Sequence, residues 1–124
     1  MTSTPNPQLL KGVLSLLLLR LVAERESYGY ELVQRLRATG LSEITDGTVY
    51  PALARLEREG RVSARLIASR SGPARKYYRP TEEGYEALAE GARDWLSLAG
   101  LVTPVLSRPV PAQPAQPAPP AEES

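Results

Sequence analysis

The sequence predicts a mainly α-helical fold with one small β-hairpin, and three observations support this prediction. Apolar residues recur at helical spacing in four separate segments of the chain. Apolar and polar residues alternate approximately over residues 61–68, shortly before Gly72-Pro73, a dipeptide typical of turns. Residues 104–124 contain seven prolines and no glycine or aromatic residue. The chain of 124 residues is therefore expected to form one small domain with a non-globular end.

The first helix is expected over residues 8–23, after a flexible N-terminal arm of residues 1–7. It is apolar on almost every side, but it is too short to span a bilayer, and Lys11 and Arg20 interrupt it. A soluble helix of this kind must be buried all round. We expect one side to pack on its own domain and the other on a second copy of the chain, and we expect no membrane partner.

A second helix is expected over residues 28–38, with Ser27 as its N-cap. A third follows after a short connection, is capped by Asp46 or by Thr48, and ends at Gly60. If Thr48 is the cap, Pro51 lies in the first turn, where a missing backbone N–H costs nothing. If Asp46 is the cap, Pro51 forfeits one hydrogen bond.

The third helix has two distinct faces at about 100° per residue. The face expected to pack in the core carries Val49, Ala52, Leu53 and Leu56. The outward face carries Thr48, Pro51, Arg55 and Arg58, with Tyr50 at its boundary. A hydroxyl, a flat apolar ring and a guanidinium are groups that contact phosphates and base edges. The N-terminal residues of a recognition helix make such contacts, so this helix is expected to enter a DNA groove.

A β-hairpin follows, with strands expected over residues 61–68 and 75–80 and the turn at Gly72-Pro73. The basic and hydroxyl side chains around this turn are Arg70, Ser71, Arg75 and Lys76. Residues 55–79 as a whole carry eight basic and two acidic side chains, an electrostatic footprint for a polyanion. The alternative is a solvated arginine-rich surface.

The last helix is expected over residues 81–103, with Thr81 as its cap. Its apolar residues repeat every seven positions and form the seam Tyr85, Leu88, Ala92, Trp95, Ala99 and Val102. A domain this small cannot cover the whole seam, so we expect it to make a homodimer. Residues 104–124 are expected to be a disordered tail of polyproline II character, or alternatively a docking site for a proline-recognising partner.

The chain contains no cysteine and no histidine. This excludes disulfides and thiolate chemistry, and it removes the usual general base and the commonest metal ligand. No pair of carboxylates stands out from the solvated surface. We therefore expect no enzyme activity, no metal site and no cofactor.

Three helices, a hairpin and a long final helix make the order of a winged helix-turn-helix. Residues 8–80 would form this DNA-binding domain and residues 81–103 the dimerisation helix. The side chains expected to contact DNA are Tyr28, Thr48, Tyr50, Pro51, Arg55, Arg70, Ser71, Arg75 and Lys76. A winged helix used instead as a protein-interaction module, with the basic block facing an acidic partner, is the alternative from another class.

Three motifs, SYGYEL (27–32), GTVYPALARLEREG (47–60) and RKYYRPTEEG (75–84), resemble the PadR family of transcriptional regulators in order and spacing. The similarity covers residues 8–102, and the single C-terminal helix resembles the compact subgroup. The resemblance implies a cytoplasmic homodimeric repressor that binds an inverted-repeat operator in double-stranded DNA and is released by a small effector. It also implies that residues 47–59 are the recognition helix, residues 69–76 the wing and the last helix the dimer contact.

The resemblance further implies an effector site at Trp95, because multidrug-responsive members stack planar drugs on a tryptophan at the matching position. Leu14, Leu18 and Ala99 are the additional walls we expect around a planar aromatic ligand. The sequence departs from those members at Ala99, where they carry an acid, which puts a preference for cationic compounds in doubt. The alternatives are that Trp95 belongs to the dimer core and that the protein binds DNA without an effector.

Overall fold

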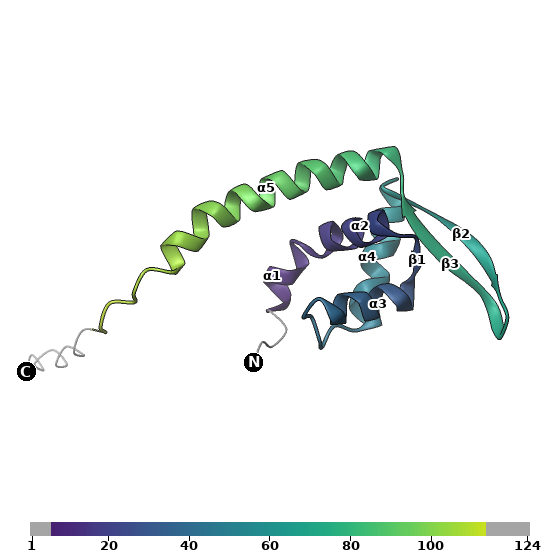
Figure 1. Cartoon of the computed structure of the whole chain (residues 1–124), viewed down its shortest axis with the longest axis horizontal. Coiled ribbons are helices and arrows are strands. Elements are labelled where there is room, and N and C mark those ends of the chain that lie inside the picture. Colours follow the sequence, from purple (N-terminus) through teal and green to yellow (C-terminus); the bar gives the residue numbers. More distant parts are fainter. Residues whose placement is uncertain (1–5, 114–124) are drawn as a thin grey trace, which may run out of the picture.

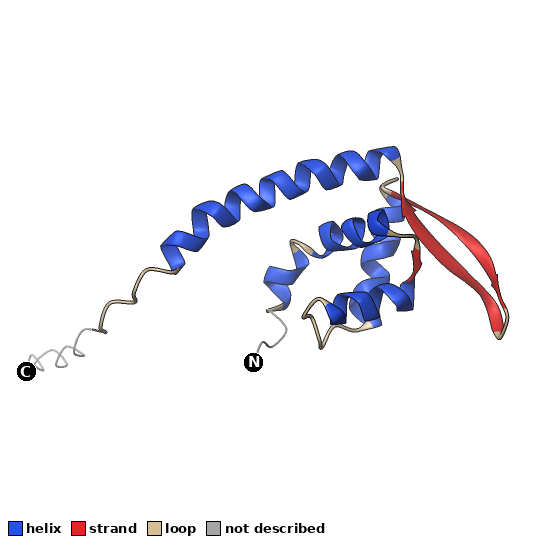
Figure 2. Cartoon of the chain, in the orientation of Figure 1, coloured by secondary structure: helices blue, strands red, loops and turns tan. Residues whose placement is uncertain are grey.

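The computed structural model describes residues 6–113, which form eight elements. In chain order these are α1 (Pro7–Lys11), α2 (Leu14–Glu24), β1 (Ser27–Tyr28), α3 (Gly29–Ala38), α4 (Asp46–Arg58), β2 (Val62–Ser69), β3 (Gly72–Pro80) and α5 (Glu82–Leu106). Helices α1 to α4 gather into one body, the β2–β3 hairpin projects from it, and α5 runs back across α2 and beyond the body (Figures 1 and 2). The predicted mainly helical winged helix-turn-helix with a long C-terminal helix is confirmed.

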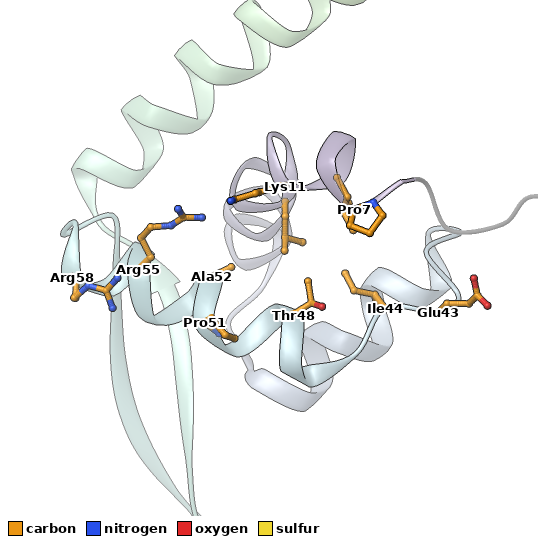
Figure 3. Close-up of a pocket in the computed structure, with 11 residues that line it drawn as sticks. Pro7, Lys11, Glu43, Ile44, Thr48, Pro51, Ala52, Arg55 and Arg58 are labelled. Carbon is orange, nitrogen blue, oxygen red and sulfur yellow. The ribbon is translucent and has the colours of Figure 1, made fainter.

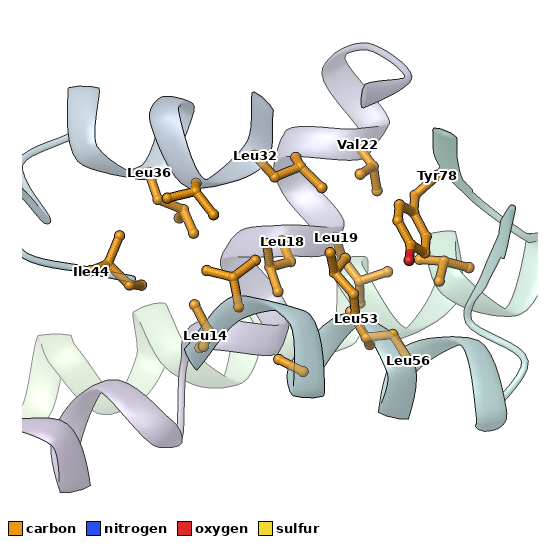
Figure 4. Packing of buried hydrophobic residues seen from close by; sticks show 14 of the residues in the cluster. Leu14, Leu18, Leu19, Val22, Leu32, Leu36, Ile44, Leu53, Leu56 and Tyr78 are labelled. Atoms are coloured by element: carbon orange, nitrogen blue, oxygen red, sulfur yellow. The ribbon is translucent and has the colours of Figure 1, made fainter. Parts of the chain in front are cut away.

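The core lies between α2, α3 and α4, and Tyr78 of β3 closes one end of it (Figure 4). Its fully buried large side chains are Leu18, Leu32, Leu36, Leu53 and Leu56. Each such burial stabilises the fold by about 1.5–3 kcal/mol relative to an exposed side chain. The predicted inner face of the third helix is confirmed, because Val49, Ala52, Leu53 and Leu56 are all buried.

The single first helix expected over residues 8–23 is divided in two. Pro7 begins α1, and the Asn6 side chain caps it by accepting a hydrogen bond from the Gln8 amide at 2.8 Å. Gly12 and Val13 then separate α1 from α2, with Val13 outside helical geometry at φ −121° and ψ −9°. Glycine and β-branched residues are weak helix formers, so this pair is a natural break. The apolar pattern continues across the break because both pieces pack on the same core.

Ser27 is not the N-cap that the sequence predicts for the second helix. It belongs to β1, pairs with Tyr78 of β3 and is completely buried, while Tyr28 takes the cap position of α3. The Ser27 hydroxyl accepts a hydrogen bond from Arg35 Nη1 at 2.9 Å. A strand of two residues carries no alternation that a sequence pattern could reveal, so the third strand of the sheet escaped prediction.

The sheet has the antiparallel order β1-β3-β2. Ser69 pairs with Gly72, so the hairpin turns at Arg70 and Ser71 rather than at Gly72-Pro73. Pro73 is accommodated because β1 pairs only with Tyr77 and Tyr78, which leaves one side of β3 without a neighbouring strand near the tip. β3 is therefore longer than predicted, whereas β2 keeps the predicted length of eight residues and begins one residue later.

Thr81 caps α5 as predicted, because its Oγ1 accepts a hydrogen bond from the Gly84 amide at 3.0 Å. The helix continues past the predicted end at residue 103, through Pro104 to Leu106. Residues 109–113 have no regular secondary structure, and the rest of the predicted tail lies outside the described residues. Within residues 6–113, no helix combines the length and the hydrophobicity that crossing a membrane requires.

Candidate nucleic-acid interface

Helix α4 begins at Asp46, so neither predicted residue, Asp46 or Thr48, is its N-cap. Thr45 is the N-cap, but its hydroxyl meets the Thr48 hydroxyl at 3.5 Å rather than a backbone amide of the helix. Asp46 accepts a hydrogen bond from the Gly47 amide at 3.0 Å. Pro51 consequently lies beyond the first turn, where it provides no N–H for the carbonyl of Gly47. Pro51 therefore costs the helix one backbone hydrogen bond, and its flat, rigid ring lies on the exposed side of α4.

The outward face of α4 forms one wall of an open hollow of about 580 Å³, and α1 forms the opposite wall (Figure 3). Thr48, Pro51 and Arg55, which the sequence predicts to share the outward face, lie together on this wall. Arg58 extends it by one turn. Lys11 reaches the same hollow from α1, and it was absent from the predicted DNA-binding set. Its signal in the sequence was that it is one of two charges, with Arg20, that interrupt a long apolar run.

Tyr50 lies on the other flank of α4, against the start of α3. A Cβ atom at Gly29 would overlap the Tyr50 ring, so only glycine permits this close approach. Tyr50 keeps 43% of its surface exposed. Burial of the rest raises the pKa of its phenol above the ordinary value, and the carboxylate of Asp46 raises it further. The phenol is therefore a neutral hydrogen-bond donor at the edge of the exposed face.

Two cations on β3 join the β2–β3 hairpin, which we call the wing, to side chains of the helical body. The guanidinium carbon of Arg75 lies 4.6 Å from the centroid of the Tyr28 ring, and that ring meets Tyr77 edge-on at 5.3 Å. Lys76 Nζ lies 2.8 Å from Glu57 Oε1 of α4. The structure therefore brings Tyr28, Arg75 and Lys76 to the base of the wing, and Arg70 and Ser71 to its exposed tip.

Charge pairing divides the basic residues of the described chain into two groups. Several cations, including Arg35, Arg65 and Lys76, form ion pairs with carboxylates. Over residues 6–113, by contrast, no carboxylate lies within ion-pair distance of the cations that line the hollow or occupy the wing tip. These are Lys11, Arg55, Arg58 and Arg70. Unpaired cations on a helix face and a hairpin tip form a surface suited to phosphate.

Residues 18–90 match the model of the transcriptional regulator PadR-like family. The chain belongs to this family. A transcriptional regulator from Mycobacterium tuberculosis is 37% identical over 90 residues, which is 72% of this chain and 81% of that protein. This agrees with the resemblance read from the three sequence motifs.

Solved PadR-like structures share the fold. A PadR-like regulator from Bacillus cereus aligns with a TM-score of 0.73 at 38% identity, over 81% of this chain and 97% of that one. A Streptococcus transcriptional regulator aligns with the same TM-score at 39% identity, over 82% of this chain and 99% of that one. These similar proteins are regulators rather than enzymes.

A second hollow of this PadR chain, of about 700 Å³, lies between α2 and α5. Trp95, with Leu88 and Ala92, lines it from α5, whereas the walls on the α2 side are Val13, Leu16, Leu17 and Arg20. The predicted effector walls Leu14 and Leu18 lie elsewhere, because both are buried in the core at 5% and 0% exposure. Ala99 is not among the residues that line this hollow.

The predicted dimer seam on α5 divides between two environments in this PadR chain. Leu88 is half-buried and packs against the core of its own domain, and Gly91 lies so close to Leu16 that a Cβ atom would collide with it. Tyr85, Trp95 and Val102 are exposed. The C-terminal half of α5 extends past the helical body and adds further exposed apolar side chains, namely Leu96, Leu98, Leu101, Val105 and Leu106 (Figure 1).

Proposed function

We propose that this PadR-family protein is a sequence-specific DNA-binding regulator that acts in the cytoplasm as a homodimer. The observation that carries the proposal is the exposed face of α4, where Thr48, Pro51 and Arg55 lie together beside a basic wing. Arg55 forms no ion pair with any carboxylate in the described part of the chain. Helix α4 would enter the major groove, where these side chains reach base edges. Arg70 at the wing tip would contact the phosphate backbone or enter the minor groove.

Binding to random-sequence duplexes, followed by selection and sequencing, tests this proposal directly. Specific binding should enrich one motif, and its affinity should fall linearly with the logarithm of salt concentration. Enrichment of no motif would contradict sequence-specific recognition. Absence of any salt-dependent DNA binding would favour the alternative, a winged helix that meets an acidic protein through the same basic surface.

The homodimer is supported by the apolar side chains that α5 exposes beyond its own domain. A contiguous apolar face of this kind marks an interaction surface, and its seven-residue repeat is typical of helix pairing. A second copy of the chain would present the same apolar face with the same repeat, so the two faces could bury one another. A two-fold dimer would place two α4 helices on an inverted repeat, with half-sites about 34–36 Å apart. Occupation of such an operator would exclude the transcription machinery, which is repression.

Release by a small effector is a second function that one observation favours, the hollow beside Trp95. Its lining is mostly apolar, and the rings of Tyr85 and Trp95 share it with the small side chains of Ala89 and Ala92. A planar aromatic compound could stack there and would release DNA if it favoured a different spacing of the two α4 helices. The alternative is that Trp95 only fills the dimer interface and that DNA binding is constitutive.

The fluorescence of Trp95, the single tryptophan, reports on this hollow. Planar dyes should quench it, and the same dyes should lower the affinity for the selected operator. Quenching without a change in DNA affinity would show that the compound binds near Trp95 but does not release DNA, which would contradict the effector proposal. Absence of quenching by any planar dye would favour the constitutive binder.

A further inference from the structure

The hollow between α1 and α4 lies beside the face of α4 that would read DNA (Figure 3). Its floor is apolar and includes Leu10, Leu14 and Ala52, all buried. Its rim carries Lys11 from α1 together with Arg55 and Arg58 from α4. An apolar floor with a cationic rim matches a chain of sugars linked by phosphates, which alternates apolar and anionic groups.

The cations on the rim lack the partners that other basic residues of this protein have. In Figure 3 the ends of Lys11 and Arg55 point toward one another across the hollow. Neither forms an ion pair among the described residues, and the one acid that lines the hollow, Glu43, lies toward its other end, away from Arg58. Two like charges that face one another are stabilised by an anion between them.

The geometry of a groove explains why an anion should reach this place. The major groove is about 12 Å wide, and a helix with its side chains is about 10–12 Å across. A helix seated in the groove therefore has one phosphodiester strand along each flank. The wing lies along the flank of α4 that carries Glu57, because Glu57 forms an ion pair with Lys76 of the wing. The hollow lies along the opposite flank of α4, where Thr48 and Arg55 line it.

We propose that the hollow receives one phosphodiester strand of the DNA and that Lys11 of α1 is a phosphate-binding residue. The inference rests on the proposed function and adds α1 to the interface that the sequence limited to α4, the wing and Tyr28. Lys11 and Arg58 hold phosphates on this flank, while Thr48, Pro51 and Arg55 remain the side chains of α4 that reach base edges. Helix α1 thereby fixes how deeply α4 enters the groove.

Four proteins test the proposal, each titrated with a fluorescent duplex of arbitrary sequence at several salt concentrations. They are the wild type, Lys11→Gln, Lys11→Arg and the control Arg93→Gln, which removes one exposed cation from α5. Lys11→Gln should lower the slope of log affinity against log salt by about 0.9 per subunit, because one phosphate contact is lost. Lys11→Arg should restore the slope, and Arg93→Gln should leave it near the wild-type value.

The outcomes separate this inference from the proposed function. If the wild type binds DNA and Lys11→Gln behaves like Arg93→Gln, the hollow takes no strand and the inference is wrong, although the protein remains a DNA binder. If the wild type binds no duplex at all, the proposed function itself fails. Lys11 is exposed at the end of α1, so circular dichroism should show an unchanged fold in both variants.

Discussion

Lys76 at the base of the wing and Glu57 on α4 form an ion pair, with 2.8 Å between Nζ and Oε1. The hydrogen bond to Glu57 raises the pKa of Lys76 above its ordinary value, so the ammonium stays charged. The two side chains are 49% and 38% exposed, and a pair of this kind contributes about 0–1 kcal/mol to stability. Its main consequence is geometric, because it links the wing to one flank of α4.

This pair makes a testable prediction about DNA affinity. Glu57→Gln should tighten binding to every duplex, because it removes a negative charge and releases the charge of Lys76. Lys76→Gln should weaken binding. In the double variant the two effects should not add, since each depends on the other residue. Titrations of the four proteins at matched salt measure the coupling, and strictly additive effects would mean that the pair does not form in solution.

Arg55→Ala should weaken binding to the selected operator by about 1–3 kcal/mol and relax the base preference at one position of each half-site, if Arg55 contacts a base pair in two places. The physical reason is its place on the outward face of α4, where no carboxylate among residues 6–113 pairs with it. Selection from random duplexes with the variant measures the preference. The control Arg93→Ala removes the same charge from α5. An unchanged motif together with unchanged affinity would remove Arg55 from the interface.

Gly29→Ala should destabilise the domain by about 1–3 kcal/mol, because the new methyl group overlaps the Tyr50 ring and overpacks the contact between α3 and α4. Urea denaturation measures the effect. In a Tyr50→Ala background the same change should become neutral or stabilising, since alanine favours a helix by about 1 kcal/mol over glycine. Gly12→Ala, which meets no close neighbour, is the control. Equal costs with and without the Tyr50 ring would contradict the contact.

Val102→Arg should convert the proposed homodimer to monomer, because it places an unpaired charge in the apolar face that α5 exposes. Val102 lies beyond the helical body, so the domain itself should stay folded. Ser97→Arg adds the same charge to an exposed position of α5 away from the seam and should leave the dimer intact. Analytical ultracentrifugation measures both. A wild type that sediments as a monomer at micromolar concentration would contradict the dimer.

Acid should weaken the contact between β2 and the segment before β1. Two hydrogen bonds join Arg65 to Glu26, and they lower the pKa of Glu26 below its ordinary value of 4.5. A lowered folded-state pKa stabilises the protein above pH 4.5, and this contribution disappears as the pH falls through the folded-state value. Thermal unfolding of wild type and Glu26→Gln should therefore differ most near neutral pH and converge in acid. A constant difference across this range would show that the pair is absent.

Local patterns were sufficient to predict much of this protein. The apolar spacing of Val49, Ala52, Leu53 and Leu56 determined which side of α4 faces the core, and the outward placement of Arg55 followed from it. The hydroxyl of Thr81 marked the start of α5, because an N-cap depends only on residues that are close in the chain. Such features rest on contacts between residues a few positions apart, and a single sequence records those contacts directly.

Only the tertiary structure decided which surface each apolar or charged residue meets. Leu14 and Leu18 are as apolar as Leu16 and Leu17, yet the first two fill the core and the others line the hollow beside Trp95. In the sequence, Lys76 and Arg75 are equivalent cations of the hairpin. In the structure, Lys76 is paired with Glu57, which lies 19 positions earlier in the chain. Periodicity tells which side of a helix is apolar, whereas the partner that covers it depends on how distant segments pack. Lys11 therefore entered the candidate interface only when α1 was seen across the hollow from α4.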